Sequence, residues 1–159
     1  MRLRRHLPIR GQSLVEFALV LPVFFLLLFG VLDLGRGVLA FNSVSNSARE
    51  GARTAIVDQT VSAINARAIR TSTGAGLSSG DIRIAFRRSN DPTNTSNVCS
   101  PATVGCVAVV TVRTLFQAAT PLIGNIVGPL CLQSTTMMAI EAVPIPAPAP
   151  PPAWTAACP

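Results

Sequence analysis

An uncharged apolar run over residues 17–32, FALVLPVFFLLLFGVL, limits what this chain can fold into more than any other feature of the sequence. A helix that crosses a bilayer needs about 20 mostly apolar residues. The apolar character continues as far as residue 41, with Asp33 and Arg36 as interruptions. The long stem of Arg36 allows its charged end to reach the membrane interface. We therefore expect one transmembrane helix over residues 12–41, tilted or in a locally thinned bilayer.

The charge distribution sets the expected orientation of this helix. Four of the thirteen arginines precede the apolar run, together with the only histidine: Arg2, Arg4, Arg5, Arg10 and His6. Basic residues beside a membrane segment stay in the cytoplasm. We expect a single-pass protein of the cell membrane, with a basic leader over residues 1–11 in the cytoplasm and the C-terminal domain outside it.

The same distribution argues against a nucleic-acid partner. The formal net charge is +6, but from position 11 onward nine arginines face seven acids, which leaves about +2. Nucleic-acid binding depends on basic residues that neutralise phosphates. Most of the excess positive charge here lies in the leader, so we expect no nucleic-acid partner.

A removable secretory signal is the main alternative to an anchor. The small residues before Phe41 offer a cut after Ala40, which would release a secreted protein that starts at Phe41. However, Asp33 and Arg36 would lie between the apolar core and that cut, and the run exceeds the usual 7–15 apolar residues of a signal peptide. Both points favour the anchor.

Glu16 does not fit a plain anchor. It lies at the start of the apolar run, where a carboxylate is costly unless it is close to the interface or paired. One interpretation is an interfacial acid stabilised by the dipole at the start of a helix. The other is an acid that meets a specific positive partner.

Residues 10–17, RGQSLVEF, closely resemble the processing site of type IV pilin-like proteins. In that family a prepilin peptidase cuts after a glycine that ends a basic leader, and a glutamate is the fifth residue of the mature chain. The resemblance implies a cut between Gly11 and Gln12. It also implies an assembly role for Glu16, which would pair with the new α-amine of a neighbouring subunit in a low-dielectric setting.

The longer segment GQSLVEFALVLPVFFLLLFGVLDLGR is similar to the opening of the TadE-like family, which are pseudopilins or minor pilins of the tight-adherence (Flp) pilus system. Residues 46–55, NSAREGARTA, fit the Ala/Arg-rich helix that follows in the family. The resemblance covers residues 10–57 and is only general over residues 80–143. It implies that the partners are the membrane, the prepilin peptidase, other pilin or pseudopilin subunits and the assembly machinery.

Two departures favour a minor pilin or assembly factor over the main fibre subunit. Gln12 stands where major pilins commonly have an aromatic residue, and the chain has a full outer domain, whereas major Flp pilins are very short. The alternative function is a single-pass membrane-anchored binding domain with an uncut leader, in which Glu16 is incidental.

The outer domain begins with an amphipathic pattern. Apolar residues recur every three or four positions at Phe41, Val44, Ala48, Ala52 and Ile56, and Val61, Ile64 and Ala68 continue the stripe. This spacing predicts one amphipathic helix in the segment 42–73, which continues the membrane helix to about residue 71 and is ended by TSTGAG.

A small antiparallel β region is expected over residues 74–143. Three strands are predicted by alternation and β-branched residues, over residues 81–87, 106–116 and 130–143, and residues 117–128 form a connection with room for one helical turn. The expected fold class is α+β, with the long helix packed on about three strands. Residues 144–159 form a Pro-rich tail, expected as a polyproline II spacer, with Trp154 and Cys158 near a frayed end.

Four cysteines bear on the compartment. Cys99 and Cys106 are close in a Ser/Asn/Pro-rich loop, and in an oxidising compartment they would form a disulfide; the other interpretation is two unpaired thiols. The sequence does not fix the pairing of Cys131 and Cys158.

Catalytic chemistry is not expected. The only histidine is in the leader, the acids are scattered, the cysteine spacing does not suit zinc, and a chain without lysine has no phosphate-binding P-loop. We therefore expect a structural protein with no cofactor, no metal and no small-molecule substrate.

Overall fold

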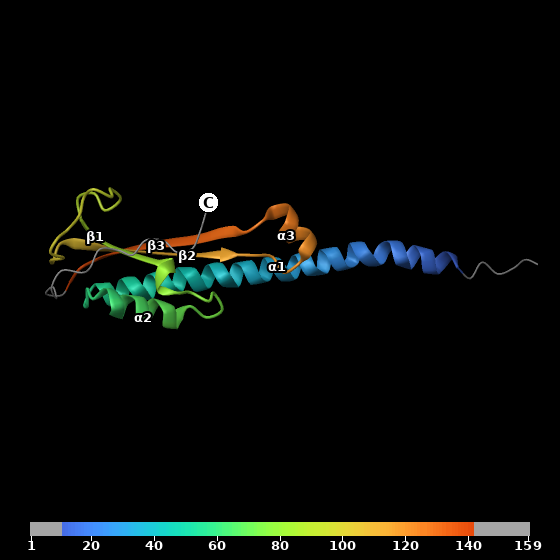
Figure 1. The fold of residues 1–159 in the computed structure, drawn as a ribbon, viewed down its shortest axis with the longest axis horizontal. Coiled ribbons are helices and arrows are strands. Elements are labelled where there is room, and N and C mark those ends of the chain that lie inside the picture. Colours follow the sequence, from blue (N-terminus) through green and yellow to red (C-terminus); the bar gives the residue numbers. More distant parts are fainter. Residues whose placement is uncertain (1–10, 142–159) are drawn as a thin grey trace, which may run out of the picture.

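A single long helix dominates the computed structural model, which describes residues 11–141 (Figure 1). Helix α1 spans Gln12–Ala55 without interruption and continues through Pro22, although proline removes one backbone donor. At 1.5 Å per residue its 44 residues extend over about 66 Å. Its N-terminal half projects beyond the rest of the fold. The basic leader and the Pro-rich tail lie outside the described residues.

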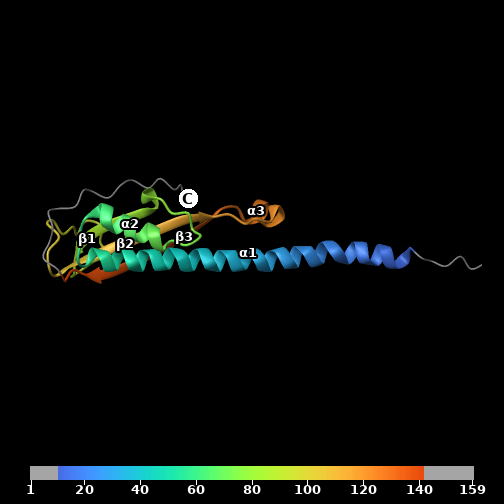
Figure 2. The same ribbon diagram turned by 90° about the horizontal axis from the view of Figure 1, so that it is seen from below.

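The amphipathic helix does not run on to residue 71 as predicted. Helix α1 ends at Ala55, and α2, Val61–Thr71, folds back beside α1 (Figures 1 and 2). The turn between them is held by Asp58, whose Oδ1 accepts a hydrogen bond from the Thr60 N–H at 2.9 Å. Such a local bond offers the backbone an alternative to continuing the helix. The expected end near residue 71 is confirmed for α2.

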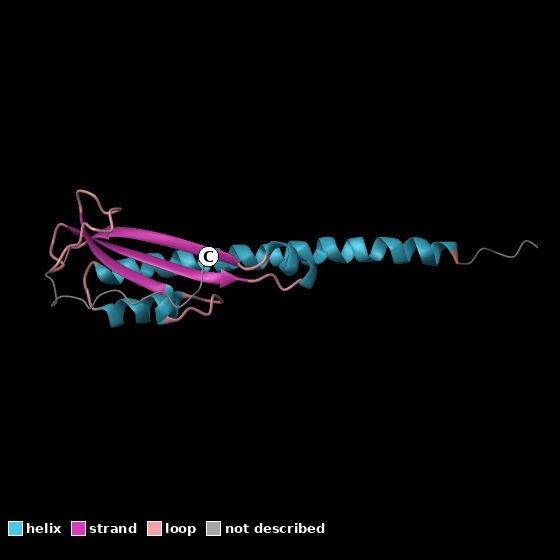
Figure 3. Cartoon of the chain, turned by 45° about the horizontal axis from the view of Figure 1, so that its top comes forward, coloured by secondary structure: helices cyan, strands magenta, loops and turns pink. Residues whose placement is uncertain are grey.

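Three strands form the antiparallel sheet that the sequence predicts, in the order β1–β2–β3 (Figure 3). Strand β1 is Ile82–Arg88, preceded by the short 3-10 turn η1, Ser79–Asp81; β2 is Cys106–Phe116 and β3 is Leu130–Ala139. The predicted limits of β2 are exact. Strand β3 ends before residue 143 because the chain turns toward the end of α1, where the Glu141 N–H donates to the Ile56 carbonyl at 3.3 Å.

The core lies between one face of the sheet and the C-terminal half of α1, with α2 completing the helical layer. The buried apolar residues alternate along the strands and recur along the helices: Val44, Ala48, Ala52 and Ala55 of α1, Ile64 and Ala68 of α2, and Ile82, Ile84, Phe86, Ala108, Val110 and Val112 of the sheet. Small residues on α1 allow close packing. A Cβ on Gly51 would lie 3.1 Å from Cγ1 of Val110 and 3.4 Å from Cβ of Ala68.

The connection between β2 and β3 holds helix α3, Pro121–Val127, which matches the helical turn allowed for by the sequence. Strand β2 runs toward the N-terminal half of α1, α3 lies at its far end, and β3 returns (Figures 1 and 3). Among the described elements outside α1, α3 lies furthest toward the start of α1.

Candidate functional site

The N-terminal half of α1 is an exposed apolar rod. Its side chains are almost all exposed between residues 11 and 32, and the most apolar 18-residue window has no buried residue. Within residues 11–141, α1 is the one helix that is long and apolar enough to cross a membrane. Residues such as Leu19 and Leu27, which are 71% and 63% exposed, would be costly to leave in water, because exposed apolar surface costs ~25 cal/mol per Å². This half of α1 therefore needs an apolar environment outside the chain.

The residues of the expected processing site lie together at the start of this rod. Gly11 directly precedes the helix, and its carbonyl accepts the first helical hydrogen bond, from the Val15 N–H at 3.1 Å. Gln12 is the first residue of α1, and Glu16 follows about one turn later on the exposed surface. Glu16 has no polar partner within residues 11–141. The region combines a helix start, an acid and a continuous apolar surface.

Asp33 is a second acid on the same helix, and its role was missed from the sequence. Its side chain is 8% exposed. Oδ1 accepts the Ala119 N–H at 3.0 Å, and Oδ2 accepts the Thr120 N–H at 2.9 Å. Arg36, one turn further on, lies 3.3 Å from Oδ1. Asp33 thus joins α1 to the segment just before α3.

One signal in the sequence could have pointed to Asp33. A carboxylate that interrupts an apolar run needs compensating partners. The identity of those partners was not accessible, because backbone amides 86 and 87 residues away supply them.

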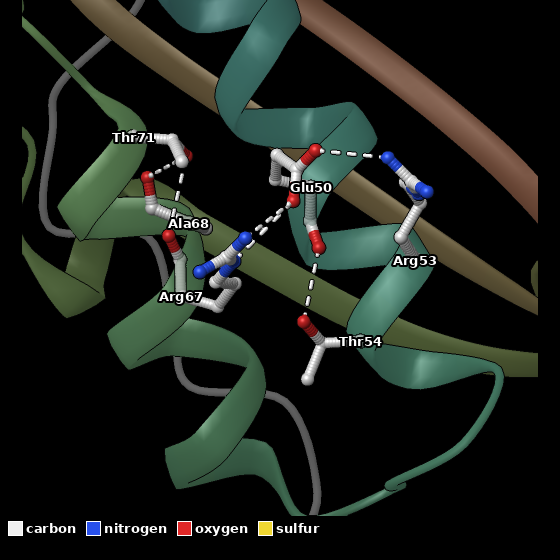
Figure 4. Close-up of polar contacts among 6 residues, drawn as sticks. All are labelled: Glu50, Arg53, Thr54, Arg67, Ala68 and Thr71. Carbon is white, nitrogen blue, oxygen red and sulfur yellow. Dashed lines mark hydrogen bonds and ion pairs between the residues drawn. The ribbon is translucent and has the colours of Figure 1, made fainter.

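Glu50, the third acid of α1, organises a polar cluster between α1 and α2 (Figure 4). Oε2 accepts from Nε and Nη2 of Arg67 on α2, at 3.3 and 3.2 Å, and Oε1 accepts from Nη1 of Arg53 at 3.4 Å. Thr54 and Thr71 donate their hydroxyls to backbone carbonyls within their own helices. Exposed ion pairs contribute about 1 kcal/mol or less. The cluster helps to align α2 on α1.

A groove of about 610 Å³ beside this cluster is lined mainly by polar side chains, among them Arg49, Arg53, Arg67 and Arg70. The guanidinium groups of Arg53 and Arg67 are already engaged by Glu50. Within residues 11–141 no three His, Cys, Asp or Glu side chains gather in an arrangement that could hold a metal ion.

The cysteine loop lies at the opposite end of the fold from the apolar rod. Cys99 and Cys106 are joined as a disulfide, with their Cα atoms 6.3 Å apart. Cys106 is the first residue of β2, and the Cys99 N–H donates to the Phe86 carbonyl of β1 at 2.9 Å. The bridge therefore fastens the polar loop after β1 to the start of β2.

Comparison with protein families gives one match. Residues 11–53 match the family model described as TadE-like protein, which confirms the resemblance indicated by the sequence. The match covers Gly11 and nearly all of α1, including Gln12, Glu16 and Asp33, and stops before α2 and the sheet. The family is one of structural pilus components. Comparisons with curated proteins and with solved structures found no match.

Proposed function

We propose, on the premise that residues 11–53 are TadE-like, that this chain is a pseudopilin or minor pilin of a tight-adherence (Flp, type IV) pilus, with a structural role in adhesion. The observation that carries the proposal is the exposed apolar half of α1, which begins beside Gly11 and bears Glu16, an acid with no polar partner among residues 11–141. Such a helix suits lateral packing against the same helix of other subunits, first in the membrane and then in an assembly.

Processing by a prepilin peptidase is the first step of this proposal. The peptidase cuts between Gly11 and Gln12 on the cytoplasmic side, so that Gln12 becomes the new N-terminus. The exposure of Gly11 supports this step, because nothing within residues 11–141 lies within 4 Å of the position of its Cβ. An exposed glycine gives a protease an unhindered backbone.

Assembly then depends on Glu16. The cut leaves a positive α-amine at the start of an apolar helix, where an opposite charge in a low-dielectric setting is strongly attracted. A buried charge without a partner is strongly unfavourable. The exposed Glu16 of a neighbouring subunit supplies that partner and fixes the axial position of one helix against the next.

The membrane orientation completes the proposal. The four leader arginines keep the N-terminus in the cytoplasm, α1 crosses the membrane once, and the sheet with α2 lies outside the cytoplasm. The Cys99–Cys106 bridge agrees with an oxidising compartment for the outer domain.

N-terminal sequencing of the membrane-extracted protein tests the processing step. A mature chain that starts at Gln12 is expected. An intact leader would favour the anchored binding domain, and a chain that starts at Phe41 would favour a secreted protein; either result would overturn the proposal.

Substitution of Glu16 tests the assembly step. Glu16→Gln keeps the size of the side chain and removes its charge, so we expect processing to continue while subunit association and surface attachment are lost. Glu141→Gln, at an exposed glutamate after β3, is the matched control and should leave all three unchanged. If Glu16→Gln behaves like the control, the chain is a generic tethered domain.

A further inference from the structure

Strand β2 and the segment after it follow α1 toward the start of the helix, and three contacts mark this path. Val110 lies against Gly51, the ring of Phe116 lies 3.6 Å from where a Cβ on Gly37 would be, and the Ala119 and Thr120 amides bond to Asp33. Each contact is nearer to the N-terminus of α1 than the one before. The segment therefore ends beside the C-terminal limit of the uncharged run over residues 17–32.

Asp33 fixes the segment at this level. Two N–H donors on one largely buried carboxylate hold the chain before α3 in both position and direction. A pocket of about 310 Å³ lies between α1 and this segment. It is lined by Phe29 and Leu32 of the apolar run and by Asp33, Arg36, Ala119 and Thr120. The segment is thus continuous with the surface that we assign to the membrane.

The composition of this segment is unlike that of the rest of the outer domain. No charged residue occurs between Arg113 and Glu141. Among the described side chains at this end of the sheet, four large apolar ones are exposed: Ile126 by 78%, Val127 by 54%, Leu130 by 46% and Leu115 by 41%. The first three lie on α3 or just after it.

We propose that residues 117–130, here called the foot, insert the exposed side chains of Ile126, Val127 and Leu130 into the headgroup and acyl boundary of the outer leaflet. Interfacial segments of this kind gain stability from burying apolar surface in that boundary. Helical rise places Asp33 about 31 Å from Gln12, close to the ~30 Å thickness of the hydrocarbon core. The exposed Arg36 at the same level reaches the lipid phosphates.

We favour the lipid surface over a protein partner because the foot lies at the level where α1 would leave the hydrocarbon core. The uncharged run covers only about 24 Å of helix, less than the hydrocarbon core. A foot fixed at Asp33 adds apolar surface where the run ends and holds the sheet against the membrane. The inference requires α1 to span the membrane, but it requires neither a cut after Gly11 nor a pilus.

Tryptophan fluorescence in full-length protein tests the foot. Trp154 is the only tryptophan, so Trp154→Phe gives a silent background. Ile126→Trp is then compared with Val104→Trp, which alters a residue that is 62% exposed in the cysteine loop at the far end of the sheet. Both proteins are reconstituted in phosphatidylcholine vesicles with and without bromine on the upper acyl chain, which quenches nearby indole.

For Ile126→Trp we expect at least about a twofold loss of fluorescence in brominated vesicles, since interfacial side chains insert to the depth of the upper acyl chain. Val104→Trp should keep its fluorescence. Equal, unquenched signals would place the foot in water and overturn the inference. A blue-shifted emission without quenching would show that protein covers the foot, which overturns it too. Val127→Trp repeats the test at a second exposed position.

The result is separable from the proposed function. A chain with an intact leader still shows quenching if the foot is interfacial, whereas a correctly cut chain without quenching would remove the foot and leave the pilin assignment in place.

Discussion

Two acids on the apolar half of α1, Glu16 and Asp33, have opposite surroundings. Asp33 is buried and accepts two backbone hydrogen bonds from within the chain. Glu16 is exposed, and the described residues supply it with no partner. A carboxylate in an apolar setting needs compensation in either case. For Asp33 the fold provides that compensation, and for Glu16 the proposed source is another subunit.

Because its pKa is lowered in the folded protein, Asp58 should contribute to a loss of stability in acid. The Thr60 hydroxyl and N–H hold the pKa of Asp58 below its ordinary value of 3.8. A lowered folded-state pKa means that the charged form stabilises the fold above pH 3.8, and that this contribution disappears as the pH falls through the lower, folded-state value. The melting temperature should therefore vary little with the state of Asp58 between pH 7 and pH 5 and fall below about pH 4.

A variant isolates the contribution of Asp58. Asp58→Asn should melt at a lower temperature than the original chain at pH 7 and show a smaller further decrease in acid, measured by circular dichroism in detergent. Some acid sensitivity should remain, because hydrogen bonds led by that of Thr93 also lower the pKa of Asp91. An unchanged slope in Asp58→Asn would contradict the assignment.

At Gly51, the contact between α1 and the sheet limits the size of the side chain. Cγ1 of Val110 would lie 3.1 Å from its Cβ, so a larger side chain has no room without moving β2 or α2. We expect Gly51→Leu to lower the free energy of unfolding by about 2–3 kcal/mol, in the range of overpacked cores. Urea unfolding followed by circular dichroism measures the loss.

Gly35→Leu is the matched control for this prediction. It places the same side chain on the same helix, where nothing lies within 4 Å of the Cβ position. Its effect should stay within about 0.5 kcal/mol, as for exposed sites. Equal losses for the two substitutions would show that packing against Val110 does not explain the result, and helix propensity could not explain it either, because leucine favours a helix more than glycine does.

At the scale of elements, the strands could be predicted better than the helical turn. Strand β2 combines alternation with β-branched residues, and its predicted limits are exact. The break after Ala55 was missed because apolar residues resume a spacing of three or four beyond it, after one step of five residues from Ile56 to Val61. Ile64 and Ala68 of α2 enter the same core as Ala48 and Ala52 of α1, so both helices show an apolar stripe although the chain reverses between them. The local signal for the break is the sequence from Asp58 to Thr60.

The residues of the candidate site could likewise be predicted only in part. Gly11, Gln12 and Glu16 follow from a local motif whose spacing can be recognised in the sequence. The contact of Asp33 with the segment before α3 depends on how β2 is aligned along α1, and that alignment is set by packing at Gly51 and Gly37. Local patterns carry no information on such long-range placement.

The disulfide between Cys99 and Cys106 closes a loop, and we expect it to stabilise the fold. Closing a loop with a sequence separation of 7 removes chain entropy from the unfolded state, which corresponds to about 2.5 kcal/mol in the loop-entropy estimate. The free energy of unfolding of a Cys99→Ala/Cys106→Ala double variant should therefore be lower by that amount, so that it unfolds at a lower urea concentration. A variant is more specific than a reductant, because Cys131 is also disulfide-bonded. Unchanged unfolding would leave the bridge without a structural role.

At the scale of the molecule, the chain divides into an apolar rod and a folded domain with little overlap. The residues of the core lie between Val44 and Ile140. The rod before residue 30 contributes nothing to that core, since its side chains are nearly all exposed. Asp33 is the point at which the two parts meet, because it lies at the end of the rod and bonds to the segment before α3.

This division predicts that the domain folds without the rod. A chain that begins at Gly30 keeps Asp33, Arg36 and the core, and exported to an oxidising compartment it should give a cooperative melting curve. Since no core contact is removed, its melting temperature should lie within about 4 °C of the full-length protein in detergent, which corresponds to less than ~1 kcal/mol for a domain of this size. Circular dichroism at several protein concentrations separates folding from association through the exposed foot. A broad, non-cooperative transition at every concentration would mean that the domain depends on the rod, and that the core between residues 44 and 140 is not sufficient for folding.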